Sequence, residues 1–161
     1  MLSTDAAVIG MFIVIFSACA LVAVTMAVHA TGVAVLLQRL VRQQAVPGAR
    51  RWPITRLLLR VIWWLLLLHL TELTVWGFFY SWRGCLPDAE TAFYFSGATY
   101  TTLGYGDVVL AKPWRILGPI EGLAGILMCG LSTGYFFVVV SRIHQALDVK
   151  ATPAAAVKAD G

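Results

Sequence analysis

Long apolar runs alternate with short polar or basic stretches along the chain. The first run covers residues 6–28, where Ser17 and Thr25 are the only hydroxyl side chains, and low polarity continues to residue 37. The second covers residues 57–80 and the third residues 116–140. A helix of about 20 apolar residues crosses the hydrocarbon core of a bilayer. Each run therefore predicts a membrane-spanning helix.

A shorter segment, residues 88–101, lies between the second and third runs. It is too short to span a bilayer and has the length of a re-entrant helix. Asp88 stands at the expected N-cap and Glu90 in the first turn, where negative charge is favourable. We expect this helix to enter the membrane and return to the same face. The predicted fold is all-α, with three transmembrane helices and a re-entrant helix between the second and third.

Composition supports a membrane protein and excludes several other classes. The 161 residues are 60% hydrophobic and 12% charged, with a mean hydropathy of +0.81, which is more apolar surface than a soluble domain of this size can bury. The net charge of +4 is therefore not a signal for nucleic acid. No Ser/His/Asp arrangement and no phosphate-binding glycine loop is visible, so neither an enzyme nor a cofactor is predicted.

The basic residues predict the orientation of the chain. Between the first and second runs there is no acidic residue from position 39 to position 60, but six arginines: Arg39, Arg42, Arg50, Arg51, Arg56 and Arg60. The positive-inside rule places this connector in the cytoplasm. A multi-pass protein of the cytoplasmic (inner) membrane is expected, with its N-terminus outside and its C-terminus inside. The acidic start of the chain argues against a cleaved signal peptide, so the first run is expected to be a retained anchor.

The sequence T-T-L-G-Y-G-D at residues 101–107 follows the re-entrant segment. It resembles the selectivity filter of potassium channels, whose usual form is T-x-G-Y-G-D. A dehydrated K⁺ ion needs closely spaced neutral oxygens, which backbone carbonyls supply. Alignment of successive carbonyls needs backbone angles of alternating sense, and Gly104 and Gly106 reach positive φ without steric cost. The resemblance implies that Thr102, Leu103, Gly104 and Tyr105 supply the oxygens that bind K⁺.

The second run, re-entrant segment, filter and third run together resemble the pore module of potassium channels. The whole chain looks like a small prokaryotic potassium channel subunit of the pore-loop (ion channel 2) family, three-helix type. The resemblance implies passive K⁺ conduction by a homotetramer, with potassium ions, membrane lipid and other copies of the chain as partners. The predicted regions are residues 1–56 (first helix and connector), 57–145 (pore module) and 146–161 (disordered cytoplasmic tail). The alternatives are a weakly selective cation channel, a non-conducting membrane assembly and a haem anchor that uses His69.

Several further residues are candidates for supporting the filter. Tyr94 lies thirteen residues before Asp107, the family spacing for a hydrogen bond to that aspartate. Ala98 stands where many prokaryotic channels carry a glutamate behind the filter, so the carboxyl is either missing or supplied from elsewhere. Glu72 and Glu121 lie inside apolar runs, where a bare charge costs about 2.5–3.5 kcal/mol.

Two interpretations of the membrane carboxylates stay open. Glu72, Glu121 and His69 form either a polar network that supports the filter from behind or an ordinary hydrogen-bonded pair between spans. We expect Glu121 to lie behind the filter, near the second span, and not to line the pore. A metal or haem site is a third interpretation, for which the expected ligands are few. Gly125 and Gly130 in the third run are candidates for a hinge or for close helix packing.

Overall fold

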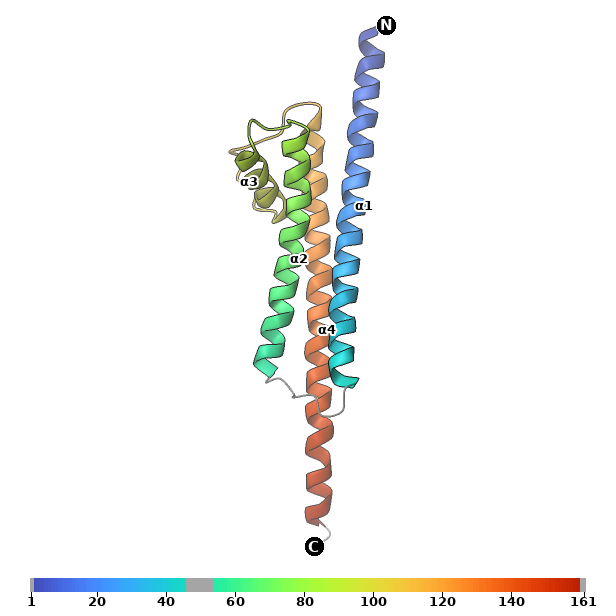
Figure 1. The fold of residues 1–161 in the computed structure, drawn as a ribbon, viewed down its shortest axis with the longest axis vertical. Coiled ribbons are helices and arrows are strands. Elements are labelled where there is room, and N and C mark those ends of the chain that lie inside the picture. The colour runs from blue at the N-terminus through green and yellow to red at the C-terminus, as the bar shows by residue number, and fades with distance from the viewer. Residues whose placement is uncertain (1, 46–53, 160–161) are drawn as a thin grey trace.

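The computed structural model describes residues 2–45 and 54–159, with side chains described for residues 8–42 and 54–145. All regular secondary structure in the described residues is helical (Figure 1). It contains four α-helices and one short 3₁₀ turn: α1 (Leu2–Ala45), α2 (Ile54–Trp82), α3 (Ala89–Tyr100), η1 (Trp114–Ile116) and α4 (Leu117–Ala159). The predicted all-α class, with a short helix between two of three long ones, is confirmed.

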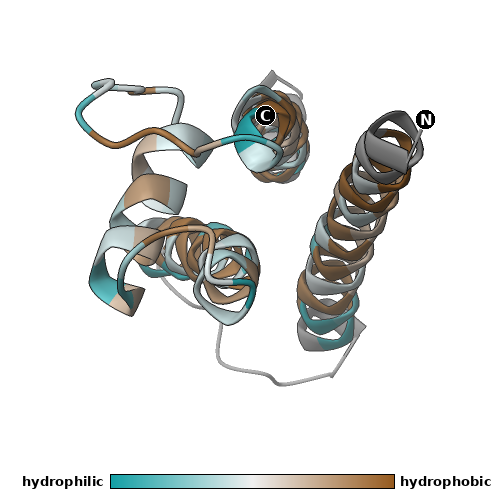
Figure 2. Ribbon diagram, turned by 90° about the horizontal axis from the view of Figure 1, so that it is seen from above, coloured by the Kyte–Doolittle hydropathy of each residue, from teal (hydrophilic) through white to brown (hydrophobic). Residues whose placement is uncertain are grey.

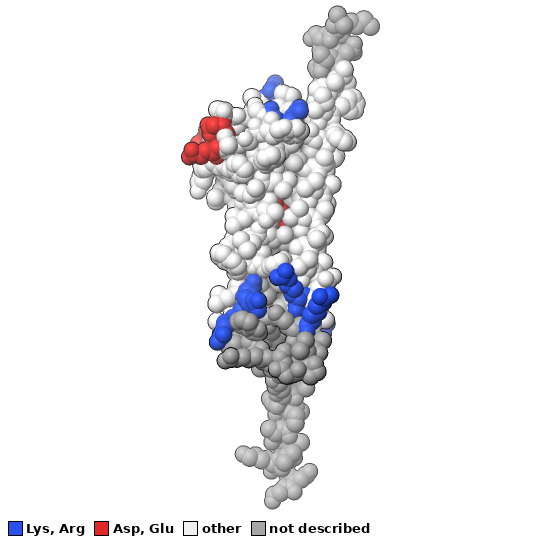
Figure 3. Space-filling view, in the orientation of Figure 1, with Lys and Arg blue, Asp and Glu red and all other residues white. Residues whose placement is uncertain are grey.

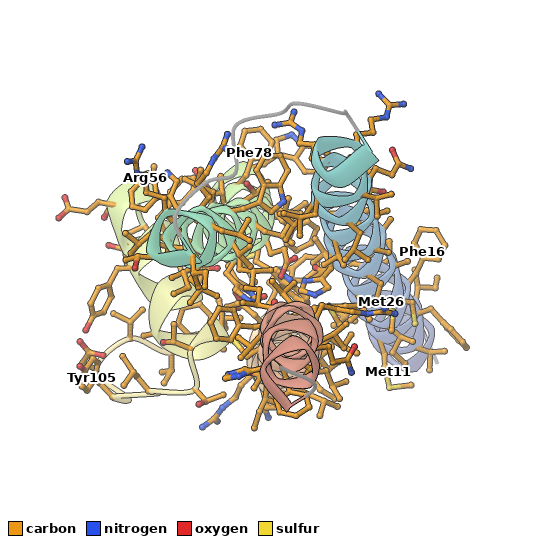
Figure 4. The ribbon with its side chains drawn as sticks, turned by 90° about the horizontal axis from the view of Figure 1, so that it is seen from below. Met11, Phe16, Met26, Arg56, Phe78 and Tyr105 are labelled. Carbon is orange, nitrogen blue, oxygen red and sulfur yellow. The ribbon has the colours of Figure 1, made fainter. Side chains whose placement is uncertain are left out.

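Three of these helices are long and apolar enough to cross a membrane, at Val8–Arg42, Ile54–Trp82 and Trp114–Gln145. Their surfaces carry many exposed apolar side chains, and brown predominates along them in Figure 2. In Figure 4 Phe16 of α1 points away from the other helices. The chain is thus a multi-pass membrane protein, and the three apolar runs of the sequence mark its spans.

Helices α2 and α4 run side by side, and α3 lies against both near one end of the molecule (Figure 1). Helix α1 packs along α2 and α4 on the side away from α3 (Figure 2). One apolar cluster lies at the level of α3 and includes Trp76, Tyr80, Phe95 and Leu117. A second, smaller cluster joins Leu36, Val61, Leu65 and Val139 further along the bundle. The first cluster fixes α3 relative to the long helices, and the second joins the long helices to one another.

Polar contacts dock α1 on α2 within the apolar interior. The Trp76 indole N–H donates to Thr25 Oγ1 at 3.0 Å. Further along, the Trp64 indole N–H donates to the Gly32 carbonyl at 3.0 Å. The helices approach closely there, since a Cβ on Gly32 would lie 2.5 Å from Leu68 Cδ1. Small residues that let backbones approach, together with interhelical hydrogen bonds, are what hold helices together in lipid.

The last helix extends past the start of the predicted tail. Helix α4 continues to Ala159. The tail is rich in alanine, which has the highest helix propensity of all residues, and it extends a helix that is already nucleated. Disorder over residues 146–161 stays a prediction.

Charged residues gather at the two ends of the membrane-spanning part (Figure 3). Arg39, Arg42, Arg56, Arg60 and Arg142 lie at the end where α1 finishes and α2 begins. The exposed acidic residues at the opposite end belong to α3 and the loop after it: Asp88, Glu90 and Asp107. Arg50 and Arg51, also part of the predicted basic connector, lie outside the described residues. Five described arginines thus form a basic end away from α3, whereas Arg83 and Arg115 lie at the α3 end.

Candidate functional site: the pore helix, the filter loop and their supports

Helix α3 begins as the sequence predicts. Asp88 is the N-cap, and its two carboxylate oxygens accept hydrogen bonds from the backbone N–H and the hydroxyl of Thr91 at 2.8 and 2.9 Å. These hydrogen bonds, from the backbone first, lower the pKa of Asp88 below its usual range. A negative charge at the N-terminus of α3 complements the helix dipole.

The filter loop folds back on the C-terminal end of α3. The backbone N–H groups of Thr101, Thr102 and Gly104 donate to carbonyls of the last turns of α3 at 3.2, 2.9 and 3.0 Å. The acceptors are Gly97, Thr99 and Ala98, respectively. These bonds satisfy carbonyls that would otherwise lack a partner at the end of a helix. The start of the filter loop is thereby attached directly to α3.

The backbone angles of the filter loop alternate in sense. Thr102, Gly104 and Gly106 have positive φ values of 62°, 53° and 79°, whereas Leu103 and Tyr105 between them do not. The sequence predicted positive φ at the two glycines but not at Thr102. For a β-branched residue this conformation costs of order 1–3 kcal/mol, and such strain persists where the surroundings impose it. Alternation at every second residue is the pattern that a column of carbonyl oxygens requires.

Filter residues 101–107 are all exposed in the single chain. The Leu103 and Tyr105 side chains are 60% and 69% exposed. Figure 4 shows Tyr105 at the outer edge of the molecule, directed away from the helices. Large apolar side chains on a strained loop are seldom left uncovered, so this face of the chain is suited to contact with another copy.

On its other side the filter loop is tied to α3 through Asp107. The Tyr94 hydroxyl donates to Asp107 Oδ2 at 2.7 Å, which confirms the contact expected from the spacing of thirteen residues. The Val108 N–H donates to Asp107 Oδ1 at 3.0 Å. The hydrogen bond from Tyr94 lowers the pKa of Asp107 and raises the pKa of Tyr94. Asp107 is thus held ionised near the end of the filter.

A hollow of about 270 Å³ lies between α3, the filter loop and the start of α4. Its lining includes Ala98, Tyr105, Asp107 and Arg115. Ala98, where the resemblance to potassium channels implied a glutamate, contributes a small side chain to this lining. Asp107 provides the only carboxyl group among the residues that line this hollow.

Glu121 of α4 supports α3 from a fully buried position. Its Oε2 accepts a hydrogen bond from the Tyr80 hydroxyl of α2 at 2.8 Å, and its Oε1 lies 2.5 Å from Ser96 Oγ of α3. Ser96 Oγ also lies 2.8 Å from the Leu73 carbonyl of α2, which can only accept. A hydroxyl has one proton to donate, so Ser96 satisfies both neighbours fully when it donates to Leu73 and accepts from a neutral Glu121. We therefore expect a protonated Glu121.

Glu72 of α2 forms a second polar cluster one helical turn nearer the filter. Its Oε2 accepts from the Tyr100 hydroxyl of α3, and its Oε1 lies 2.8 Å from His29 Nδ1 of α1. His69 Nδ1 lies 3.5 Å from Glu72 Oε2 and 3.0 Å from the Tyr100 hydroxyl oxygen. His69 Nε2 lies 3.0 Å from Ser132 Oγ of α4. This cluster therefore joins all four α-helices around Tyr100.

The structure adds two facts to the interpretations that the sequence left open, a polar network or a hydrogen-bonded pair between spans. Glu121 makes no hydrogen bond or ion pair with His69 or Glu72 among the described residues; each carboxyl holds a different residue of α3, Ser96 or Tyr100. Those two residues are spaced i, i+4 and share a face of the helix. The position expected for Glu121, buried near the second span, is confirmed.

The second fact concerns His29, which the sequence analysis missed. It stands at the end of the first apolar run, and a histidine inside a span is itself a signal of a polar partner or a functional site. Its partner Glu72 lies 43 residues away in the chain, and only the antiparallel packing of α1 on α2 brings them together. The same signal had already pointed to His69.

The two candidate hinge glycines of α4 have different surroundings. A Cβ on Gly125 would overlap the backbone carbonyl of Tyr100, so this position needs glycine for close packing of α4 on α3. A Cβ on Gly130 would meet nothing within 4 Å in the chain. The packing interpretation therefore has direct support at Gly125, and a hinge role stays a prediction at both glycines.

Residues 65–142, slightly under half of the chain, match the model of a protein family described as "Ion channel". The match runs from within α2 through α3 and the filter loop to the region where α4 carries Arg142. The family is one of ion channels and not of enzymes, in agreement with the sequence analysis. Searches of curated proteins and of solved structures each found no match.

Proposed function

The chain carries an ion channel domain at residues 65–142, and on this premise we propose that it is a potassium-selective channel subunit. In this proposal four copies surround one pore, each supplies one filter strand, and K⁺ passes down its electrochemical gradient. Backbone carbonyls of Thr102, Leu103, Gly104 and Tyr105 bind the ion, and Gly106 completes the strand.

One observation carries the potassium assignment: the alternation of positive φ at Thr102, Gly104 and Gly106. A turn needs positive φ at one or two positions, but not at every second residue of a five-residue stretch. Such an alternation supports a strand that presents successive carbonyls to one side. Helix α3 adds to this, since its C-terminal end, which carries partial negative charge, lies next to the start of that strand and favours a cation there.

A homotetramer follows from the incompleteness of the single chain. One filter strand cannot surround an ion, and closed cyclic symmetry lets identical strands do so. The exposure of Leu103 and Tyr105 marks the filter loop as a surface that neighbouring copies would cover. Membrane lipid is the other partner, facing the exposed apolar side chains of α1.

The proposed orientation places the basic end in the cytoplasm of the cell (inner) membrane. Arg39, Arg42, Arg56 and Arg60 lie at this end together with Arg142. Positive residues near span ends are retained on the cytoplasmic side during insertion. The filter loop and the N-terminus would then lie at the outer side, and the C-terminus inside.

The deciding experiment compares wild type with Gly104→Ala in liposomes, with K⁺ flux measured against competing Na⁺. Within one chain a Cβ at Gly104 meets nothing within 4 Å, so inside the chain this substitution acts through the strain of positive φ. We expect loss of K⁺ conduction or of K⁺ selectivity. The matched control is Gly84→Ala in the outer turn, where φ is +61° and the Cβ also meets nothing. It carries the same strain away from the filter and is expected to leave selectivity unchanged.

Each alternative predicts a different result in this assay. A weakly selective cation channel would pass Na⁺ and K⁺ alike in the wild type. A non-conducting membrane assembly or a haem anchor would give no flux, and a haem anchor would in addition absorb visible light. Undiminished K⁺ selectivity in Gly104→Ala would refute the assignment of residues 101–107 as a selectivity filter.

A further inference from the structure

Two histidines and a carboxylate converge in the interior of the bundle. One ligand atom from each of His29, His69 and Glu72 lies within 4.8 Å of the corresponding atoms of the other two. His29 comes from α1 and the other two from α2, so packing of separate helices creates the cluster. The imidazole rings of the two histidines are 5.6 Å apart between centroids.

Hydrogen bonding within the chain leaves this cluster incompletely satisfied. Among the described side chains, His29 Nε2 is the one buried nitrogen or oxygen without a hydrogen-bond partner. His29 and Glu72 are 2% and 0% exposed, so neither reaches bulk water. Polar groups in a dry site normally have partners, and an unpartnered one calls for an unseen ligand. Nothing in the ion pathway requires imidazoles at this place.

We propose that His29, His69 and Glu72 bind a divalent first-row transition-metal ion of the zinc type. Two imidazole nitrogens and one carboxylate oxygen are a donor set typical of zinc sites that keep one position open, and they do not suit K⁺ or Mg²⁺. Zinc–ligand bonds of about 2.0–2.2 Å in tetrahedral geometry place ligand atoms about 3.3–3.6 Å apart. The ligand atoms here lie within 4.8 Å of one another, so side-chain shifts of about 1 Å would bring them onto one ion.

The fourth position of such an ion lies beside Tyr100. The Tyr100 hydroxyl oxygen is 3.0 Å from His69 Nδ1 and donates to Glu72. A metal ion bound to His69 and Glu72 would occupy the lone pairs of these two side chains. It would therefore compete with the hydrogen bonds that the Tyr100 hydroxyl makes to His69 and Glu72. Tyr100 is the last residue of α3, two positions before Thr102 of the filter. If the proposed channel function holds, metal binding would therefore loosen the support of the filter and lower K⁺ flux.

Binding is tested first, independently of conduction. The full-length purified chain, with Cys19, Cys85 and Cys129 replaced by serine to remove thiol ligands, is titrated with Zn²⁺ alone in a calorimeter. Co²⁺ serves as a second probe because its visible absorption reports nitrogen and oxygen ligands. The test variant is His29→Gln, whose amide can still donate to Glu72 and preserve the docking of α1. The control is His144→Gln, which changes the exposed histidine at the far end of α4.

We expect one Zn²⁺ per chain, unchanged affinity in His144→Gln, and a loss of affinity of about tenfold or more in His29→Gln. Absence of Zn²⁺ binding, or equal affinity in His29→Gln, would overturn the proposal. If His29→Gln does not fold, the Co²⁺ spectrum of the serine-substituted chain decides by itself. A cobalt spectrum without nitrogen ligands would overturn the proposal.

The second arm measures K⁺ flux in liposomes with and without Zn²⁺. Inhibition in the parent chain and its relief in His29→Gln are expected. Unchanged flux at saturating Zn²⁺ would refute the coupling to the filter. A parent chain without any K⁺ flux would contradict the proposed function but leave the binding result intact, so the two failures are distinguishable.

Discussion

At the scale of single residues, the filter loop depends on conformations that side chains normally resist. Gly104 and Gly106 adopt positive φ at no steric cost, whereas Thr102 is strained in the same conformation. Hydrogen bonds on both sides impose it: Thr102 N–H is bound to Thr99, and Gly104 N–H to Ala98. Asp107, near the other end of the loop, is held by Tyr94. The loop is therefore strained but anchored at both ends.

Tyr94→Phe is predicted to move the acid sensitivity of the filter to higher pH. In the wild type the hydrogen bond from Tyr94 lowers the pKa of Asp107. The stabilisation of the filter loop by ionised Asp107 is therefore fully present above the ordinary carboxyl pKa and is lost as pH falls through the lowered pKa. Without the hydroxyl, the pKa of Asp107 rises toward its usual value. K⁺ flux measured from neutral to acid pH should then decline at a higher pH in the variant. Identical acid midpoints would show that Asp107 does not control conduction.

Glu121→Gln and Glu121→Ala are predicted to differ sharply. A glutamine keeps both contacts of a neutral carboxyl, because its NH₂ donates to Ser96 and its carbonyl accepts from Tyr80. Alanine leaves these buried hydroxyls unsatisfied and costs about 1–3 kcal/mol for each group left without a partner. Single-channel recording should show shorter open times in Glu121→Ala, a smaller change in Glu121→Gln, and similar selectivity in both.

Infrared spectroscopy checks the protonation of Glu121 directly. The carbonyl stretch of a protonated carboxyl should be present in the wild type and missing in Glu121→Gln. A wild-type spectrum without this band would contradict the inference that Glu121 is protonated and donates to Ser96. Wild-type open times in Glu121→Ala would show that the residue only fills space.

At the scale of elements, α3 is held by close backbone packing as well as by hydrogen bonds. Gly77 of α2 faces the Phe93 ring, and Gly125 of α4 faces the backbone of Tyr100. Ser96 and Tyr100 then bind the carboxyls of α4 and α2, respectively. The short helix is thus fixed by two long helices along one face, which explains how 12 residues stay in place inside a membrane.

Gly125→Ala and Gly130→Ala form a matched pair for this packing. The added Cβ at Gly125 would overlap the Tyr100 carbonyl, and overpacking of this kind typically costs about 1–3 kcal/mol. At Gly130 the Cβ meets nothing in the chain, and alanine gains up to about 1 kcal/mol of helix propensity. Thermal unfolding in detergent should show a lower midpoint for Gly125→Ala only. If both variants unfold at the wild-type temperature, α4 does not pack on α3 as described.

The elements could be predicted from sequence more fully than the contacts between them. Apolar length gives the spans, and Asp88 with Glu90 gives the start of α3, because these are local signals. His29 escaped prediction because its partner depends on how α1 packs against α2. The positive φ of Thr102 could not be predicted from the sequence, because threonine disfavours this conformation. Only the anchoring of the loop at both ends imposes it. The pairing of Glu121 with Ser96 likewise depends on tertiary structure.

At the scale of the whole molecule, α1 lies outside the matched ion channel region and yet is joined to its interior. Thr25, His29 and Gly32 each contact a residue of α2 through a polar group. Through Glu72, the middle contact leads to Tyr100 and so to the start of the filter. The first helix therefore has a route by which it can influence the filter, in addition to anchoring the chain.

The orientation of the molecule gives the last prediction. Five described arginines lie at the end of the bundle away from α3, against Arg83 and Arg115 at the other end, and cytoplasmic retention of the larger group places the filter loop outside. Two single cysteines, in a background with Cys19, Cys85 and Cys129 replaced by serine, test this with a membrane-impermeant thiol reagent on intact cells. Glu90→Cys, at the exposed start of α3, should be labelled at once, whereas Gln44→Cys, near the end of α1, should react only after the membrane is permeabilised. The reverse pattern would place the N-terminus and the filter loop inside, and labelling of both in intact cells would show that the two sites do not lie on opposite sides of the membrane.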